Sequence, residues 1–251
     1  MIIIKPIASG SDGNSYALKH DGSWLLLEAG VPFSQVRPSI DYKTQDVDGC
    51  LISHEHGDHA GHIETYTKRG IDCYCSEGTK EILKRKRAVH TNLLSPDKRQ
   101  PTKVGPWKFV SFSVPHDARD PVGWLIGAGD NKLLYVTDAE YVEYNFQGLT
   151  HIMIECNYTK EKLNENINKG RIKPAFKKRL IENHMGLEDI KLLLRRNDIS
   201  ELKKIYLLHL SKRNSQPERM VEEVQLITGC PTYIAGGAAE WTKKSEKRLE
   251  S

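Results

Sequence analysis

Short apolar runs separated by polar, glycine-rich turns dominate the first half of the chain. Alternating or continuous apolar positions predict strands at residues 2–7, 16–19, 24–27 and 49–53. Beyond residue 60 the pattern alternates, with helices expected at 61–69 and 78–87 and a short strand at 72–75. An opening β-meander followed by alternating strands and helices indicates a layered α/β protein.

The apolar runs of the second half end at side chains that can bind metal. Strands are predicted at residues 107–114, 122–126, 132–136, 152–155 and 204–208. Helical patterns cover 217–228 and the polar stretch 159–194, which Gly170, Pro174 and Gly186 interrupt. His116, Asp138 and His209 stand just beyond three of the strands. Because ligand sites in α/β sheets gather at strand ends, we expect these three side chains to meet one another and also His54 and His56, which follow the apolar run 49–53.

A dense group of potential metal ligands follows the apolar run 49–53. It consists of His54, His56, Asp58 and His59, in a segment expected to be the loop leaving the strand. Alternation on an extended backbone puts His54 and His56 on one side, and a bend at Gly57 presents Asp58 and His59 to a second position. Imidazole and carboxylate groups suit zinc, manganese or iron, so this pattern predicts one or two metals. The alternative is a solvated loop that happens to be rich in histidine.

Composition indicates the number of domains and argues against disulfide-rich and membrane proteins, but it does not identify a substrate. At 251 residues and 38% hydrophobic content, the chain can bury one sizeable core, and we expect a single domain over 1–241 with a flexible tail at 242–251. The net charge of +4 permits an anionic partner but does not require one. Five cysteines without a C-x-x-C pair argue against a disulfide framework, and no apolar run is long enough to span a membrane. A cytoplasmic location is therefore expected.

Two segments are candidates for contact with a polyanion. A basic, polar helical insertion is expected around 159–196, where Lys177 and Lys178 lie close to His184 in sequence. The loop 9–15, which contains Ser11 and Asn14, offers hydroxyl and backbone N–H groups to a phosphate. A simple hairpin turn explains the same loop equally well.

The H-x-H-x-D-H pattern of residues 54–59, together with the later ligands, resembles that of the metallo-β-lactamase-fold hydrolases. The resemblance implies an α/β fold arranged as a four-layer αββα sandwich. It also implies two divalent metal ions with Asp138 as a bridge. One metal would be held by His54, His56 and His116, and the other by Asp58, His59 and His209.

Further motifs, spread over residues 9–212, are similar to those of the WalJ (YycJ) branch, whose members are regarded as cytoplasmic 5′-to-3′ DNA exonucleases. They are Ser9-Gly10-Ser11-x-Gly13-Asn14-Ser15, His116-Asp117-Ala118, Thr137-Asp138, Glu155-x-Asn157-Tyr158 and Leu208-His209-Leu210-Ser211-Lys212. The chain departs from the branch in carrying Glu28 for an aspartate, and in the residues that surround His184. These departures bear on end recognition and strand polarity more than on the metal ligands.

The expected activity is metal-dependent hydrolysis of a phosphodiester, with DNA as substrate. Two metals would lower the pKa of a shared water toward neutrality, and the resulting hydroxide would attack phosphorus. Asp58 would orient this hydroxide, while His184 would protonate the leaving oxygen or hold the phosphate, unless it is an ordinary surface histidine. Substrate contacts are expected from Ser11, Asn14, Asn157, Lys177 and Lys178. The alternatives are a small-molecule hydrolase of the same fold, acting on a lactone, thioester or cyclic phosphate, and a non-catalytic nucleic-acid-binding subunit.

Overall fold

The computed structural model describes residues 1–236 except 88 and 90, so the tail predicted at 242–251 lies outside the described residues. The chain divides into two compact units. Unit 1 comprises Met1–Ser113 and Asp117–Tyr135, and unit 2 comprises Val114–His116 and Val136–Ser251. The expectation of a single domain over 1–241 stays a prediction.

Unit 1 contains a six-stranded mixed sheet in the order β1-β2-β3-β4-β5-β6. Its antiparallel half is β1 (Ile3–Ala8), β2 (Ser15–His20) and β3 (Ser23–Leu27). Its parallel half adds β4 (Val47–Leu51), β5 (Cys73–Tyr74) and β6 (Leu93–Leu94) to β3. The predicted opening meander is therefore confirmed, and the short strand β6 is an addition to it.

Helices of unit 1 bury apolar residues against the core of this sheet. They are α1 (Phe33–Val36), α2 (Gly57–Ala60), α3 (Glu64–Thr67) and α4 (Glu77–Arg87), with 3-10 turns at Arg37–Ile40 and Thr44–Asp46. Phe33, Ile63 and Leu83 belong to one buried cluster with Trp24. The helix α4 ends in four basic residues, whose charges interact favourably with the carboxyl end of a helix.

The predicted boundary between loop and helix in residues 54–69 is wrong. A helix was expected at 61–69, but helical structure begins inside the ligand group as α2 and resumes as the short α3. The amides of His59 and Ala60 both donate to the carbonyl of His56, at 3.1 and 2.8 Å, which closes a helical turn directly after the strand loop. Asp58 and His59 are therefore helical rather than loop residues.

Unit 1 also holds an antiparallel ladder in the order β10-β9-β8-β7. The strands are β7 (Thr102–Val104), β8 (Trp107–Ser113), β9 (Val122–Ala128) and β10 (Asn131–Val136), the last of which reaches the boundary of the unit. Trp107 and Trp124 are fully buried, and the indole N–H of Trp107 donates to the hydroxyl of Ser23 at 2.8 Å. The predicted hairpin of β9 and β10 is confirmed, and its strands continue the ladder of β8.

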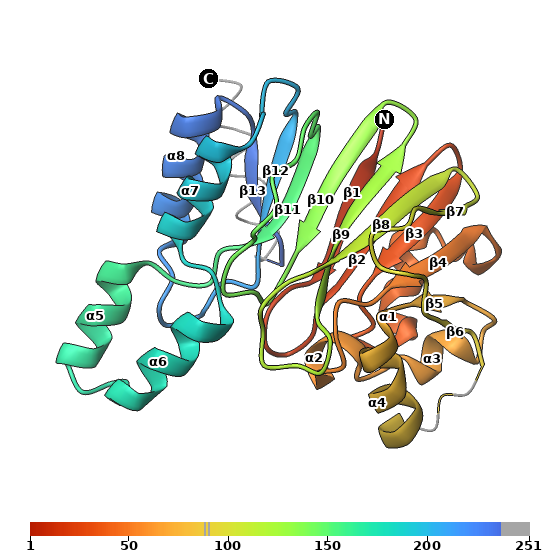
Figure 1. Ribbon diagram of the computed structural model, residues 1–251, viewed down its shortest axis with the longest axis horizontal. Helices are drawn as coiled ribbons and strands as arrows, with labels where there is room; N and C mark the ends of the chain where they lie inside the picture. The colour runs from red at the N-terminus through yellow and green to blue at the C-terminus, as the bar shows by residue number, and fades with distance from the viewer. Residues whose placement is uncertain (88, 90, 237–251) are drawn as a thin grey trace. The chain divides into compact units, whose positions relative to one another are not determined.

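Unit 2 is built on three parallel strands in the order β11-β12-β13 (Figure 1). These are β11 (His151–Glu155), β12 (Lys204–Leu208) and β13 (Thr232–Ile234). All residues of β11 are buried, as a strand covered on both faces requires. Helices α7 (Leu187–Arg196) and α8 (Pro217–Thr228) lie side by side, with α8 against β13.

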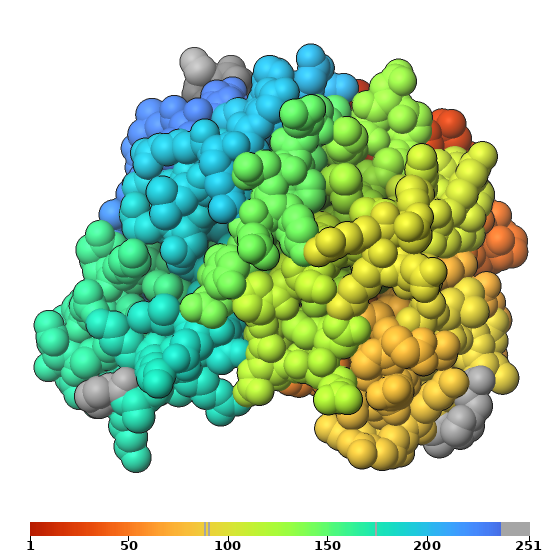
Figure 2. Space-filling view, in the orientation of Figure 1, coloured from red at the N-terminus to blue at the C-terminus, as the bar shows by residue number. Residues whose placement is uncertain are grey.

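The polar insertion forms a helix pair, α5 (Lys160–Asn168) and α6 (Pro174–Asn183), with a small apolar cluster of its own. Leu163 of α5 and Leu180 of α6 meet Tyr158 in that cluster. Figure 2 shows α5 and α6 at the surface of the molecule. The helices end and begin close to Gly170, Pro174 and Gly186, so the predicted interruptions are confirmed. Within the part of the chain that the structure describes, no helix is long and apolar enough to cross a membrane.

His151 makes the stability of unit 2 dependent on pH. It is buried at the start of β11, and burial, followed by the nearby charges of Lys203 and Lys204, lowers its pKa to about 4. An unfolded histidine has a pKa of about 6.5, so between these values the unfolded chain binds the proton. Stability should therefore fall as the pH drops from about 6.5 toward 4.

We expect the replacement His151→Gln to remove this contribution. Wild type should lose roughly 2–3 kcal/mol more unfolding free energy than the variant between neutral pH and pH of about 4. Urea unfolding followed by tryptophan fluorescence at several pH values measures the difference. Parallel pH dependences for the two proteins would contradict the assignment.

Candidate metal centre

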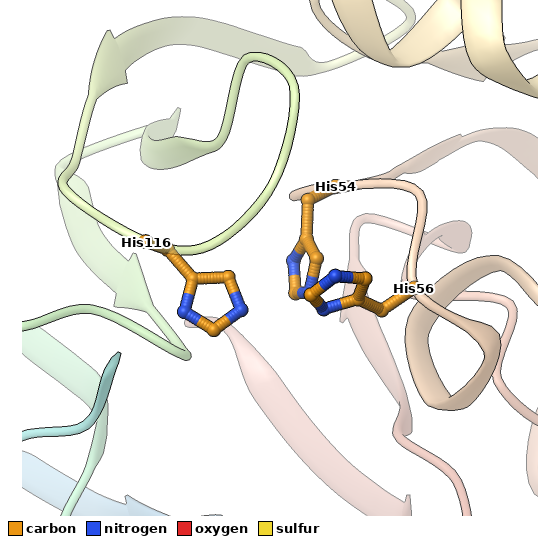
Figure 3. A group of neighbouring side chains, drawn as sticks. All are labelled: His54, His56 and His116. Carbon is orange, nitrogen blue, oxygen red and sulfur yellow. The ribbon is translucent and has the colours of Figure 1, made fainter. Parts of the chain in front are cut away.

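The end of β4 presents two imidazoles to each other. Residues 50–54 are buried, and the chain turns immediately afterwards, so that Nε2 of His54 lies 3.0 Å from Nδ1 of His56. Nδ1 of His54 lies 2.9 Å from the hydroxyl of Ser53. When that nitrogen carries the proton, Nε2 is left with a lone pair for a metal. Figure 3 shows the His54 and His56 rings together, and it also labels His116 from unit 2.

The helical turn α2 supplies Asp58 and His59. His59 is fully buried, and its Nε2 lies 3.3 Å from a carboxylate oxygen of Asp58 and 3.1 Å from the amide nitrogen of Asn14. The ring centroids of His54 and His59 are 4.2 Å apart. Unit 1 thus brings together all four ligands predicted from the H-x-H-x-D-H pattern.

Behind these ligands lies the buried carboxylate of Glu28. It accepts hydrogen bonds from the backbone N–H of Ser53, at 3.2 and 3.3 Å, and from the hydroxyl of Tyr135 at 2.9 Å. An oxygen of Glu28 lies 3.6 Å from Nδ1 of His59. Glu28 therefore holds the end of β4 through hydrogen bonds and places a carboxylate beside the ring of His59.

The loop 9–15 packs against Asp58 instead of standing free. The backbone N–H of Asn14 donates to the carbonyl of Asp58 at 2.7 Å, and that of Gly30 donates to the carbonyl of Asn14 at 3.0 Å. A Cβ on Gly30 would lie 1.8 Å from the Asp58 carbonyl oxygen, so a side chain at this position would displace the loop. Asn14 is buried, whereas Ser11 is exposed.

In unit 2, strand ends bring His116, Asp138 and His209 together, as predicted. These residues follow β8, β10 and β12 respectively. Nδ1 of His209 lies 2.9 Å from Oδ1 of Asp138, and Nε2 of His116 lies 3.8 Å from Oδ2 of the same carboxylate. Asp138 thus has one oxygen near each imidazole.

Asp138 and His209 adopt a backbone conformation that side chains rarely take. Their φ angles are 44° and 51°, in the left-handed region. Such residues cost about 1 kcal/mol or more each and persist where surrounding contacts hold them. For His209 one such contact is the amide nitrogen of Asn157, which donates to the His209 carbonyl at 2.9 Å.

Glu155, the last residue of β11, organises the candidate ligands of unit 2. Its carboxylate is fully buried and accepts hydrogen bonds from Nδ1 of His184 at 2.7 Å and from Nδ1 of His209 at 2.9 Å. The backbone N–H groups of Met185 and Ala139 also donate to it, at 3.2 and 3.4 Å. Ligand atoms of Asp138, Glu155, His184 and His209 all lie within 4.8 Å of one another, a spacing that could hold a metal ion.

The two partners of this buried pair shift each other's pKa. Burial alone raises the pKa of Glu155, but the charge of His184 and hydrogen bonds from His184 and His209 outweigh it and lower the pKa. Burial alone lowers the pKa of His184, but the Glu155 carboxylate and then Asp138 raise it. His184 is therefore not an ordinary surface histidine, because it belongs to a charged pair.

Sequence reasoning assigned no role to two residues of the centre, Glu28 and Glu155. Both were noticed, Glu28 as a departure from the WalJ branch and Glu155 as part of a motif. A sequence signal for both is that each carboxylate directly follows a run of three or more apolar residues, Leu25–Leu27 for Glu28 and Ile152–Ile154 for Glu155. The predicted basic contacts stand at the helix α6, where Lys177 donates to Asn164 at 2.9 Å and Lys178 pairs with Glu182 at 3.7 Å.

Known proteins share both the sequence and the fold. Over 226 residues the chain is 29% identical to the protein named exodeoxyribonuclease WalJ of Streptococcus pneumoniae, covering 84% of this chain and 82% of that one. Over 232 residues it is 28% identical to the exodeoxyribonuclease YycJ of Bacillus anthracis, covering 84% and 83%. The metallo-β-lactamase fold protein YhfI of Bacillus subtilis superposes with a TM-score of 0.71 at 15% identity, covering 94% and 97%.

These comparisons confirm the expected fold and family. The likeness to YhfI shows the metallo-β-lactamase fold, with two mixed sheets and flanking helices. A family model described as the beta-lactamase superfamily domain matches residues 23–209, which include every candidate ligand. The chain therefore belongs to the beta-lactamase superfamily domain family.

Proposed function

We propose that this protein is a metal-dependent phosphodiester hydrolase that digests DNA as an exonuclease. The observation that carries the proposal is a complete set of seven candidate ligands in a chain that is 29% identical, over 84% of its length, to a named exodeoxyribonuclease. The buried pair of Glu155 and His184 adds a proton donor, which cleavage of a phosphodiester needs at its leaving oxygen.

The donor set fits two divalent metal ions. In this proposal His54, His56 and His116 would hold one metal and Asp58, His59 and His209 the other, with Asp138 as a ligand that both would share. Imidazole and carboxylate donors suit zinc or manganese, with iron as an alternative. When bound, such metals activate a water for attack and neutralise charge on the phosphate.

Other roles in the proposed reaction fall to side chains: orientation of the water, proton donation and contact with the substrate. Asp58 is half-buried and therefore able both to hold metal and to orient the attacking water. His184, kept protonated and oriented by Glu155, donates its proton to the leaving oxygen. Ser11, Lys177 and Lys178 reach the surface and contact the nucleic-acid strand.

Asn14 and Asn157, which are buried, support the site through the backbone that they hold. The amide nitrogen of Asn14 lies 3.3 Å from the carbonyl oxygen of Asp58, and that of Asn157 donates to the carbonyl of His209 at 2.9 Å. Both asparagines thereby fix a ligand-bearing segment against a strand end.

The direct test is digestion of end-labelled DNA with manganese or zinc present. We expect metal-dependent release of mononucleotides from the 5′ end of single- or double-stranded DNA carrying either a 5′-phosphate or a 5′-hydroxyl. Activity should disappear with a chelator. Inert DNA beside hydrolysis of a lactone or cyclic phosphate would instead identify a small-molecule hydrolase.

Asp58→Asn and Asp138→Asn should each lower kcat by more than about a hundredfold, because loss of an outer partner alone typically costs 10–100-fold. Both substitutions keep side-chain size while removing the charge that holds metal. Initial rates on DNA and metal content per chain measure the effect. Asp130→Asn, in the exposed turn between β9 and β10, is the matched control. Full metal-dependent activity in either ligand variant would rule out the assignment.

Glu155→Gln tests the carboxylate that joins His184 to His209. The amide keeps the size of the side chain but cannot accept from both imidazoles with the same charge, so we expect metal affinity to fall roughly 10–100-fold. Titration calorimetry with manganese measures affinity, and circular dichroism verifies the fold. Glu143→Gln, an exposed residue of the same unit, should bind metal like wild type. Unchanged affinity in the Glu155 variant would show that this carboxylate does not position the ligands.

A further inference from the structure

Unit 2 contains a basic pocket of about 450 Å³, lined by Lys162, Asn166, Arg171 and Arg213. Lys162, Asn166 and Arg171 lie in the insertion around 159–196 that is expected to contact a polyanion, Arg213 lies outside it, and none of the four belongs to the candidate metal centre. Pockets that bind small ligands or parts of larger ones span about 300–1,000 Å³, so the volume suits a group of nucleotide size. Three of the four lining side chains are cationic, which selects for an anion.

A buried amide at the base of the pocket fixes its shape. Asn166 of α5 is only 3% exposed, and its Nδ2 donates to the carbonyl of Arg213 at 2.8 Å and to Oδ1 of Asn214 at 2.9 Å. Its Oδ1 accepts a hydrogen bond from Nη1 of Arg171 at 3.3 Å. One side chain thus joins α5, the α5–α6 loop and the loop after β12. A pocket held in this way loses little conformational entropy when a ligand binds.

The guanidinium of Arg213 has the hydrogen-bonding capacity for such a ligand. It is exposed, and among residues 1–236 that the structure describes, no acceptor or carboxylate holds it. Arg219 provides the contrast, because Glu161 and Glu223 pair with it at 3.1 and 2.6 Å. A guanidinium offers two parallel N–H groups that match two oxygens of a phosphate.

The pocket lies on the same two chain segments as the Glu155 and His209 side chains. Arg213 follows His209 by four residues, and α5 begins soon after β11 ends at Glu155. Backbone hydrogen bonds join the two segments, from Ser211 to Asn157 at 2.9 Å and from Thr159 to Asn214 at 3.0 Å. The pocket and the side chains of Glu155 and His209 therefore belong to joined segments of one unit.

We propose that this pocket binds a phosphate group of the nucleic-acid strand, away from the bond that is cut. The proposal rests on the proposed function, since it takes the strand as the molecule that also reaches the metal centre. Arg213 and Arg171 supply the donors, and Lys162 adds charge while it remains paired with Glu165 at 2.9 Å. The bound group is either a phosphodiester of the backbone or the 5′-terminal phosphate.

Binding of fluorescein-labelled single-stranded DNA to the metal-free protein tests the pocket. Fluorescence anisotropy over a series of salt concentrations gives the affinity and its salt dependence. Arg213→Gln should weaken binding about tenfold at low salt, as expected for loss of a charge-assisted contact. It should also make the slope of log affinity against log salt shallower by about 0.7, the value for one phosphate contact on a single strand.

Arg195→Gln is the matched control, because Arg195 is exposed on α7 of the same unit and does not line the pocket. It should retain the wild-type affinity and slope. The pocket proposal is overturned if Arg213→Gln behaves like wild type, if Arg195→Gln has the same effect, or if wild type binds no DNA.

Two further arms identify the phosphate and separate this proposal from the proposed function. If the 5′-terminal phosphate occupies the pocket, the effect of Arg213→Gln vanishes with 5′-hydroxyl DNA; if a backbone phosphate does, the effect persists. Hydrolysis of bis(p-nitrophenyl) phosphate with manganese should be equal in wild type and Arg213→Gln, because this diester is too small to extend to a distant pocket. A loss there would place Arg213 in the centre itself and refute the pocket.

A wild type that hydrolyses neither DNA nor the small diester, yet binds DNA through Arg213, would disprove the proposed function and leave the pocket standing.

Discussion

Burying an ionised carboxylate costs several kcal/mol unless donors surround it, and each compact unit of this chain meets that constraint at the end of a strand. In unit 1 Glu28 is surrounded by the amide of Ser53 and the hydroxyl of Tyr135 and lies beside His59. In unit 2 Glu155 accepts from His184, from His209 and from backbone amides. His184 and His209 are donors to Glu155 and are also candidate metal ligands. The hydrogen bonds that satisfy the buried Glu155 carboxylate therefore also orient these ligands.

The surrounding backbone shows the consequence of that coupling. Glu28, Asp138 and His209 all have positive φ angles, which side chains tolerate only where other contacts compensate. For Glu28 the contacts include the Ser53 amide and the Tyr135 hydroxyl, and for His209 they include the side-chain amide of Asn157. A rigid apolar scaffold thus holds polar groups in a geometry that they would not adopt by themselves, and that is what a metal centre requires.

The proposed DNA hydrolysis and the basic pocket use different physical effects. At the metal centre, chemistry depends on short distances between imidazole and carboxylate atoms. At the pocket, recognition depends on charge and on the fixed amide of Asn166, with no group positioned to read a base edge. The pocket and the candidate metal centre use different side chains, so mutations can separate affinity for a DNA strand from its cleavage.

Several features could be predicted from the sequence because they depend on local pattern. The strands and the breaks at Gly170, Pro174 and Gly186 follow from periodicity and from backbone chemistry. The extent of helix at residues 57–67 did not follow, since hydrogen bonds to the His56 carbonyl decide it. Likewise Thr159, Asn166 and Arg213 carry no motif, and only folding brings their segments together.

The sequence by itself determined the family, the strands other than the short β6, β7 and β13, and the identity of the candidate ligands, because apolar pattern, donor type and spacing are properties of the chain. Tertiary structure alone decided that Glu155 accepts hydrogen bonds from His184 and His209, that Glu28 lies beside His59 and that a basic pocket exists in unit 2. The reason is physical: the partners of a buried charge, and the walls of a pocket, come from segments distant in sequence, and their distances are set only when those segments pack.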